Sequence, residues 1–244
     1  MDFSKEHWTE HDYVVFAKYL HSIAEEGYRE FNENMIPCDY PMIGIRIPQL
    51  RELAKKIVKG GWKSYLQSAK DTSHEEVMLQ GMIIAMVSSK LEFSNILKYI
   101  TYYVPKMNSW ALVDTFCGDL KSVAQHQEEA FFCIVHYLKS KEEYQVRFGV
   151  VMLMYYYLDE MHIQTVFQLF DSAKHTGYYV KMALAWAISV AFVKMQEKTF
   201  SYLQQNQLEE WTYQKALQKI LESNRVDVLT KERIRTIKKQ RKHE

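Results

Sequence analysis

The sequence is short of glycine and proline, with 8 and 4 residues among 244. Average usage is about 7% glycine and about 5% proline. A chain with so few turn-forming residues does not supply the many tight turns of a β-sandwich or β-barrel, or the glycine-rich loops that bind phosphates. All-β folds and doubly wound nucleotide-binding folds are therefore disfavoured, and a long array of helices is expected.

Cysteine and long apolar runs are scarce as well. The three cysteines, Cys38, Cys117 and Cys133, are odd in number and irregularly spaced, so the sequence predicts neither a disulfide framework nor a zinc ribbon. The N-terminus is polar, without a signal-peptide pattern, and the most apolar stretch, residues 182–193, is too short to cross a bilayer. We predict a cytoplasmic protein with no membrane segment. The nine histidines are scattered, and no metal site is expected.

Charge is nearly balanced, with 31 Lys and Arg against 30 Asp and Glu. Nucleic-acid binding is compatible with this balance only if the basic surface is local. The chain becomes basic after residue 226, and segment 226–244 is either a last capping helix whose bases reach DNA or a solvated terminus.

Helical periodicity covers most of the chain. Residues 13–24 carry an amphipathic stripe, and Pro48 suits the first turn of a helix over 49–59. We expect N-terminal helices within about 1–30. Segment 31–48 contains three of the four prolines and is predicted to be an irregular connection.

A repeat follows. Segments 146–150 and 180–184 align at an offset of 34, and a further 34 residues lead to Lys215, so Arg147, Lys181 and Lys215 are equivalent. Helices predicted near 77–87 and 110–120 have similar spacing. In this series of helices, each one after the first is preceded by an amphipathic segment, at 92–102, 127–139, 162–173 and 196–205 respectively. This pattern predicts an all-α fold: an α-solenoid of about six stacked antiparallel helix pairs with a concave groove, formed by the whole chain, 1–244, as one HEAT-like-repeat domain.

The repeated basic positions have two interpretations. They are either solvated surface residues or a ladder that follows a phosphate backbone along the groove. Trp110 and Asp114 lie one helical turn apart. Either the indole ring and the carboxylate together hold a cationic group, or the ring packs in the core and the carboxylate caps a helix or forms an ion pair. Trp186 on its own is expected in the core. No GxSxG, HExxH, Walker or CxxC motif is present.

Taken together, four segments resemble the AlkD-like DNA alkylation repair proteins, a family of HEAT-like-repeat DNA glycosylases. Order and spacing agree over about residues 31–224. The matching segments are Met42-Ile43-Gly44-Ile45-Arg46-Ile47-Pro48-Gln49-Leu50-Arg51, Ser109-Trp110 with Asp114, Gly118 and Asp119, Val146-Arg147, and Val180-Lys181 with Trp186.

The resemblance implies a function and site residues. Relatives hydrolyse the N-glycosidic bond of cationic N3- and N7-alkylated purines in double-stranded DNA, without a cofactor or metal and without having to flip the base into a pocket. Asp114 matches the catalytic carboxylate, Trp110 and Trp186 match two indoles that flank the lesion, and Arg147 matches a base that contacts the DNA backbone. We also expect Lys181, Lys215, Arg46 and Arg51 to bind DNA. The protein is expected to be a monomer.

Two departures leave alternatives open. Ile47 stands where the family has Thr, and Ser189 stands where active relatives carry Arg three residues after the second Trp. A non-catalytic relative that binds DNA, including branched or distorted DNA, is therefore the alternative to a glycosylase. A protein-binding scaffold is a more distant third possibility.

Overall fold

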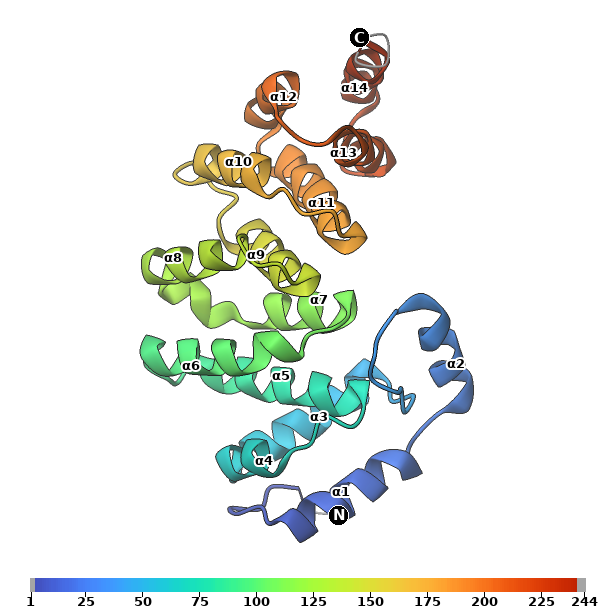
Figure 1. The fold of residues 1–244 in the computed structure, drawn as a ribbon, viewed down its shortest axis with the longest axis vertical. Helices are drawn as coiled ribbons and strands as arrows, with labels where there is room; N and C mark the ends of the chain where they lie inside the picture. Colours follow the sequence, from blue (N-terminus) through green and yellow to red (C-terminus); the bar gives the residue numbers. More distant parts are fainter. Residues whose placement is uncertain (1–2, 241–244) are drawn as a thin grey trace. The chain divides into compact units, whose positions relative to one another are not determined.

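The computed structural model describes residues 3–240 and contains only helices and loops over that range. It consists of two compact units, Met1–His126 and Gln127–Glu244. The predicted all-α class is confirmed (Figure 1). Residues 241–244, the end of the predicted basic tail, lie outside the described range.

The first unit holds seven α-helices and two short 3-10 helices in its described part. These are α1 (Glu10–Ser22), α2 (Glu26–Met35), α3 (Ile47–Val58), α4 (Trp62–Ser68), α5 (His74–Ser88), α6 (Phe93–Tyr103), η1 (Val104–Lys106), α7 (Trp110–Asp119) and η2 (Lys121–Gln125). Helix α5 packs between α3 and α7 (Figure 1). Because it is enclosed by neighbours, nearly all of its side chains are buried, including Glu75, Glu76 and Gln80.

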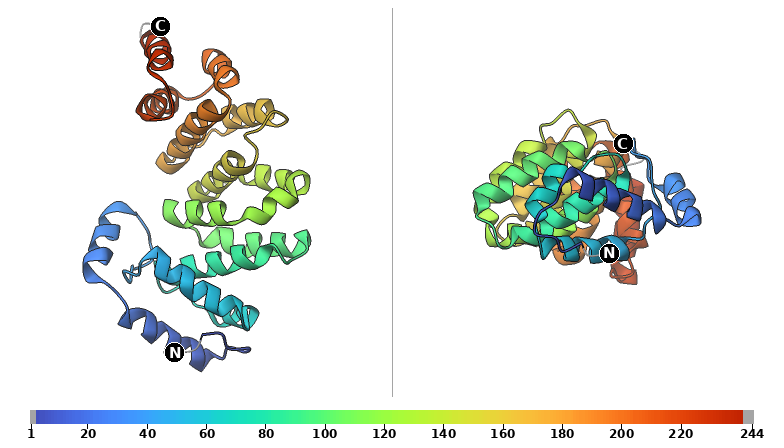
Figure 2. Two further views of the ribbon diagram at one scale, coloured as in Figure 1. Left: turned by 180° about the vertical axis from the view of Figure 1, so that it is seen from behind. Right: turned by 90° about the horizontal axis from the view of Figure 1, so that it is seen from below.

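The N-terminal part of this unit corrects one predicted boundary. Helix α2 continues to Met35, so residues 31–35 of the predicted irregular connection are helical. The helix ends only where Ile36, the residue before Pro37, becomes extended, which the proline ring requires. The irregular connection is therefore 36–46, and α3 begins at Ile47 with Pro48 in its first turn, as expected. Figure 2 shows α2 and this connection beside the stacked helices of the unit.

The second unit repeats the two-helix pattern. Its helices are α8 (Gln127–Tyr137), α9 (Glu143–Tyr156), α10 (Ile163–Ser172), α11 (Tyr178–Lys194), α12 (Gln196–Gln205), α13 (Glu210–Glu222) and α14 (Val228–Gln240). Helix α11 packs between α9 and α13, which carry the corresponding repeat positions. Within this unit, the second helices of successive predicted pairs thus stack on one another, as a solenoid requires.

Candidate active site

Helix α7 places Trp110 and Asp114 one turn apart. The helix starts at Trp110 because the hydroxyl of Ser109 accepts a hydrogen bond from the Leu112 amide and caps the first turn. Trp110 and Asp114 are both half-buried, whereas the opposite side of α7 is in the core. The indole Nε1 of Trp110 donates a hydrogen bond to the carbonyl of Met35, 3.4 Å away at the end of α2. The two predicted catalytic residues of this unit therefore face the same region.

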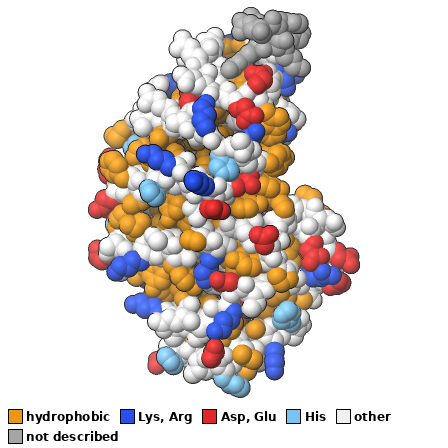
Figure 3. Space-filling model, in the orientation of Figure 1, with side chains coloured by type: hydrophobic (Ala, Val, Ile, Leu, Met, Phe, Trp, Pro, Cys, Tyr) orange, Lys and Arg blue, Asp and Glu red, His pale blue; other side chains and the backbone are white. Residues whose placement is uncertain are grey.

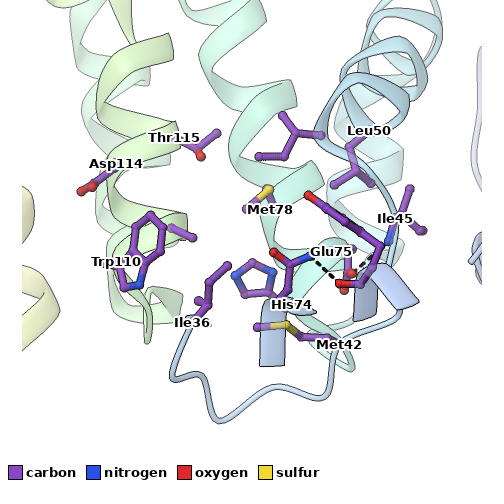
Figure 4. A pocket seen from close by; sticks show the side chains of 14 residues that line it. Ile36, Met42, Ile45, Leu50, His74, Glu75, Met78, Trp110, Asp114 and Thr115 are labelled. Atoms are coloured by element: carbon purple, nitrogen blue, oxygen red, sulfur yellow. Dashed lines mark hydrogen bonds between the residues drawn. The ribbon is translucent and has the colours of Figure 1, made fainter. Parts of the chain in front are cut away.

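That region contains a pocket with a volume of about 170 Å³. Its walls come from α2, the 36–46 connection, α3, α5 and α7, so residues far apart in sequence meet there. Figure 4 shows Trp110, Asp114 and Thr115 on one side and His74, Glu75 and Met78 on the other. The sequence alone did not predict this pocket.

Glu75 fixes the connection that forms one wall of the pocket. Its carboxylate, 5% exposed, accepts hydrogen bonds from the backbone amides of Ile43 (2.9 Å), Gly44 (2.6 Å) and Ile45 (3.2 Å). Gly44 has a φ of 93°, and a Cβ there would lie 2.6 Å from the carbonyl oxygen of Glu25. The glycine of the 42–51 segment is therefore required by the backbone.

His74 is the second buried polar residue of the pocket. Its Nε2 lies 3.2 Å from the Ser109 hydroxyl, which links α5 to the start of α7. Burial lowers the pKa of His74 below its ordinary value, so the imidazole is neutral near pH 7. No local pattern indicates this role, since His74 stands among ordinary first-turn residues of a helix.

Arg46 and Arg51, both predicted to bind DNA, form ion pairs in this unit. Arg46 pairs with Glu25 at 2.8 Å, and its guanidinium carbon lies 4.9 Å from the ring centre of Tyr28. Arg51 pairs with Asp119 at 2.7 Å, which joins α3 to α7. Their contact with DNA stays a prediction, and either side chain would have to share its guanidinium between a carboxylate and a phosphate.

The repeated basic residues occupy equivalent positions on three helices of the second unit. Arg147 on α9 is 5% exposed and donates to the carbonyl of Tyr179 at 2.8 Å. Lys181 on α11 pairs with Glu209 at 2.8 Å, and Lys215 on α13 donates to Gln218 at 3.2 Å. The structure thus gives the three positions different environments, which a simple row of solvated bases does not predict.

Trp186 lies on α11, also in the second unit. It is half-buried and meets Tyr155 edge-to-face, with ring centres 6.3 Å apart, so it is less enclosed than the core position expected from composition. The Ser189 hydroxyl donates to the Trp186 carbonyl at 2.8 Å within the same helix. Trp186 and Arg147 belong to one unit, and Trp110 and Asp114 to the other.

Lys219 is a basic residue that the repeat did not reveal. Burial and the charges of Lys215 and Arg147 lower the pKa of its ammonium, and the nearby charge of Glu222 only partly opposes them. In the described part of the chain, neither Lys215 nor Lys219 forms an ion pair with a carboxylate. The offset of 34 identifies only one position in each helix, so it does not identify Lys219, which lies one turn after Lys215 on α13.

Charge elsewhere is mixed. On the face drawn in Figure 3, basic and acidic side chains alternate and no single large basic patch stands out. Within residues 3–240 no three His, Cys, Asp or Glu side chains come together in a metal-binding group, and no helix is both long and apolar enough to span a membrane.

The fold and this site define a class: a helical-repeat protein with an acidic and aromatic pocket in one unit and clustered cations in the other. Residues 16–220 match the model of the DNA alkylation repair enzyme family, and the chain belongs to that family. The fold is similar to the X-ray crystal structure of AlkD2 from Streptococcus mutans, with a TM-score of 0.55, 16% sequence identity, and coverage of 87% of this chain and 97% of that one. A search of curated proteins gives no significant match.

Proposed function

We propose that this protein is a DNA glycosylase that removes cationic N3- and N7-alkylated purines from double-stranded DNA. The observation that carries the proposal is the placement of Trp110 and Asp114 one turn apart on α7, both lining one pocket. Membership of the DNA alkylation repair enzyme family supports the same conclusion. Monomeric state and cytoplasmic location remain predictions.

The proposed reaction needs little help with the leaving group. When the bond between C1′ and the purine nitrogen breaks, its electron pair stays with the base and neutralises the positive charge of the alkylated ring. The sugar develops an oxocarbenium charge, which the Asp114 carboxylate stabilises by electrostatic attraction. Water then adds to C1′, and its proton passes to the carboxylate or to solvent. The indole face of Trp110, beside the sugar, stabilises the same positive charge.

Binding of the duplex is proposed to rest on the cations of the second unit. Phosphate contacts hold and orient a protein on DNA without reading its sequence. Arg147, Lys215 and Lys219 lie close enough to influence one another electrostatically, and an anion among them would relieve their mutual repulsion.

The test is release of N7-methylguanine and N3-methyladenine from methylated duplex DNA by the wild type and by Asp114→Asn. Electrostatic stabilisers of this kind contribute about 100- to 1,000-fold in rate. We expect the variant to lose at least that much activity and to bind undamaged DNA as the wild type does. Glu92→Gln, which removes an exposed carboxylate from the same unit, should retain full activity.

A non-catalytic DNA-binding protein is the second candidate. It is favoured by Ile47, an apolar residue that lines the pocket where the resemblance expects a Thr. Wild-type protein that binds DNA but releases no base would decide for this candidate. Equal release by the wild type and Asp114→Asn would instead show that the carboxylate has been assigned wrongly.

A further inference from the structure

The start of α7 is held by three different segments of the first unit. The thiol of Cys38, in the irregular connection, donates a hydrogen bond to the side-chain oxygen of Asn108, 3.0 Å away. The imidazole of His74, the first residue of α5, lies 3.2 Å from the hydroxyl of Ser109. The indole of Trp110 donates to a carbonyl at the end of α2. Three consecutive residues therefore each contact a separate part of the unit.

The contact between His74 and Ser109 is the most enclosed of the three. His74 is 4% exposed and Ser109 is 0% exposed, whereas the hydrogen bond of Trp110 is open to solvent. The Ser109 hydroxyl already accepts the hydrogen bond from the Leu112 amide that caps α7. A serine hydroxyl also has one proton to donate, and a neutral imidazole has one nitrogen that accepts. With Nε2 as the acceptor, the hydroxyl bonds to both partners at once.

We propose that His74 is a positioning residue for the catalytic end of α7, acting through the Ser109 hydroxyl. Trp110 directly follows this N-cap and Asp114 lies one turn further on, so both side chains move when the first turn shifts or frays. His74 itself has a firm support, because α5 packs between α3 and α7. The catalytic use of the two side chains rests on the proposed function, while the hold on the first turn of α7 rests on the contacts alone.

The proposed chemistry is sensitive to such a hold. A carboxylate that stabilises charge at C1′ acts across a fixed distance, and a misplacement of about 1 Å costs about 100-fold in rate. Trp110 and Asp114 are only half-buried, so packing on their solvent side does not fix them. In Figure 4 the imidazole of His74 lies across the pocket from the Asp114 carboxylate. Its influence on Asp114 therefore passes through the cap of the helix.

The first experiment needs no enzymatic activity. His74→Leu removes the acceptor, and His74→Gln replaces Nε2 with an amide oxygen that also accepts. Hydrogen exchange at the Leu112 amide should become about fivefold faster in the Leu variant and stay within about twofold of the wild type in the Gln variant, as loss or retention of a cap predicts. In protein labelled with 5-fluorotryptophan, the signal assigned with Trp110→Phe should shift only in the Leu variant. Unchanged exchange and an unchanged signal in His74→Leu would overturn the proposal.

Gln80→Leu is the matched control, because it removes a buried polar side chain from the same helix. The hydrogen-bond partners of Gln80 are Lys70, Asp71, Tyr102 and Lys106. In the described part of the chain, none of these partners lines the pocket. Gln80→Leu should lower the melting temperature and leave the Leu112 exchange and the Trp110 signal unchanged. The same changes in both variants would show a general loss of stability and would refute a positioning role.

Ser109→Ala reaches the same contact from its other side, and it serves if His74→Leu does not fold. Since Ser109→Ala already removes the partner of His74, adding His74→Gln or His74→Leu to it should change the exchange of the Leu112 amide by less than about twofold. Effects of the two substitutions that multiply in full would mean that His74 does not act through Ser109.

Base release under single-turnover conditions separates positioning from binding. With methylated duplex DNA, His74→Leu should release N7-methylguanine at least about tenfold more slowly than the wild type, and its dissociation constant for undamaged duplex should change less than about twofold. His74→Gln should recover most of the rate. A loss of affinity alone, or a Gln variant as slow as the Leu variant, would contradict the proposal. A wild type that releases no base would contradict the proposed glycosylase, while exchange and the fluorine signal would still decide the role of His74.

Discussion

The Glu75 carboxylate offers the sharpest test of how the pocket is built. It is 5% exposed and accepts three backbone hydrogen bonds, from Ile43, Gly44 and Ile45. Glu75→Gln keeps the length of the side chain and one carbonyl oxygen, but its amide nitrogen replaces an acceptor with a donor. At least one backbone N–H of the connection then faces another N–H in a buried place.

The magnitude follows from these contacts. A hydrogen bond to a charged group contributes about 1.5–3 kcal/mol, and a buried donor left without a partner costs about 1–3 kcal/mol. We therefore expect Glu75→Gln to lower the free energy of unfolding by about 3 kcal/mol. For a chain of this size each kcal/mol shifts the melting temperature by roughly 2–4 °C, so a fall of roughly 6–12 °C is expected.

Thermal unfolding followed by circular dichroism measures this change, with Glu92→Gln as the control for loss of an exposed carboxylate. Hydrogen exchange should become faster at the amides of residues 43–45, which tests the cause as well as the size. A melting temperature within 2 °C of the wild type, with unchanged exchange at these amides, would refute the assigned role of Glu75; the 2 °C limit corresponds to less than about 1 kcal/mol.

Two further predictions concern charge. Lys219→Gln should change the melting temperature little, because it removes both the repulsion from Lys215 and Arg147 and the attraction of Glu222. The slope of log affinity for DNA against log salt, measured by fluorescence anisotropy, should fall by about 0.9 in magnitude. An unchanged slope would exclude a phosphate contact at Lys219. The lowered pKa of His74 means that the unfolded chain binds this proton more readily, so the stabilisation is complete above about pH 6.5 and is lost as the pH falls below it. His74→Gln should flatten that part of the curve of melting temperature against pH, and a curve identical to that of the wild type would contradict the buried, neutral state.

Much of the helical framework could be predicted because each helix carries a local signal. The segments predicted at 127–139, 162–173 and 196–205 correspond to α8, α10 and α12, each within two residues at either end. Spacing of apolar residues along one helix depends only on neighbouring positions. Residues 31–35 are the exception. The prolines that follow residue 36 made the whole segment 31–48 look irregular, although the helix needs to stop only one residue before Pro37.

The candidate site was accessible from sequence only where a single helix holds it. Trp110 and Asp114 share one turn of α7, so their spacing predicted a shared face. The partners of Arg46, Arg51 and Lys181 lie 21, 68 and 28 positions away along the chain, and nothing in a local pattern indicates that these side chains pair with carboxylates. Pairing of this kind is decided by tertiary packing.

The two departures from the family pattern lie in different environments in the structure. Ile47 stands where the family pattern has Thr, yet its half-buried side chain lines the pocket and adds to its apolar wall. Ser189 has no such compensation, because its hydroxyl is turned back onto the Trp186 carbonyl and supplies no charge. The basic group of the family pattern is therefore absent at residue 189, on α11 of the second unit. The chemistry proposed for Trp110 and Asp114 does not depend on that absence, because residue 189 on α11 is not among the residues that line the pocket.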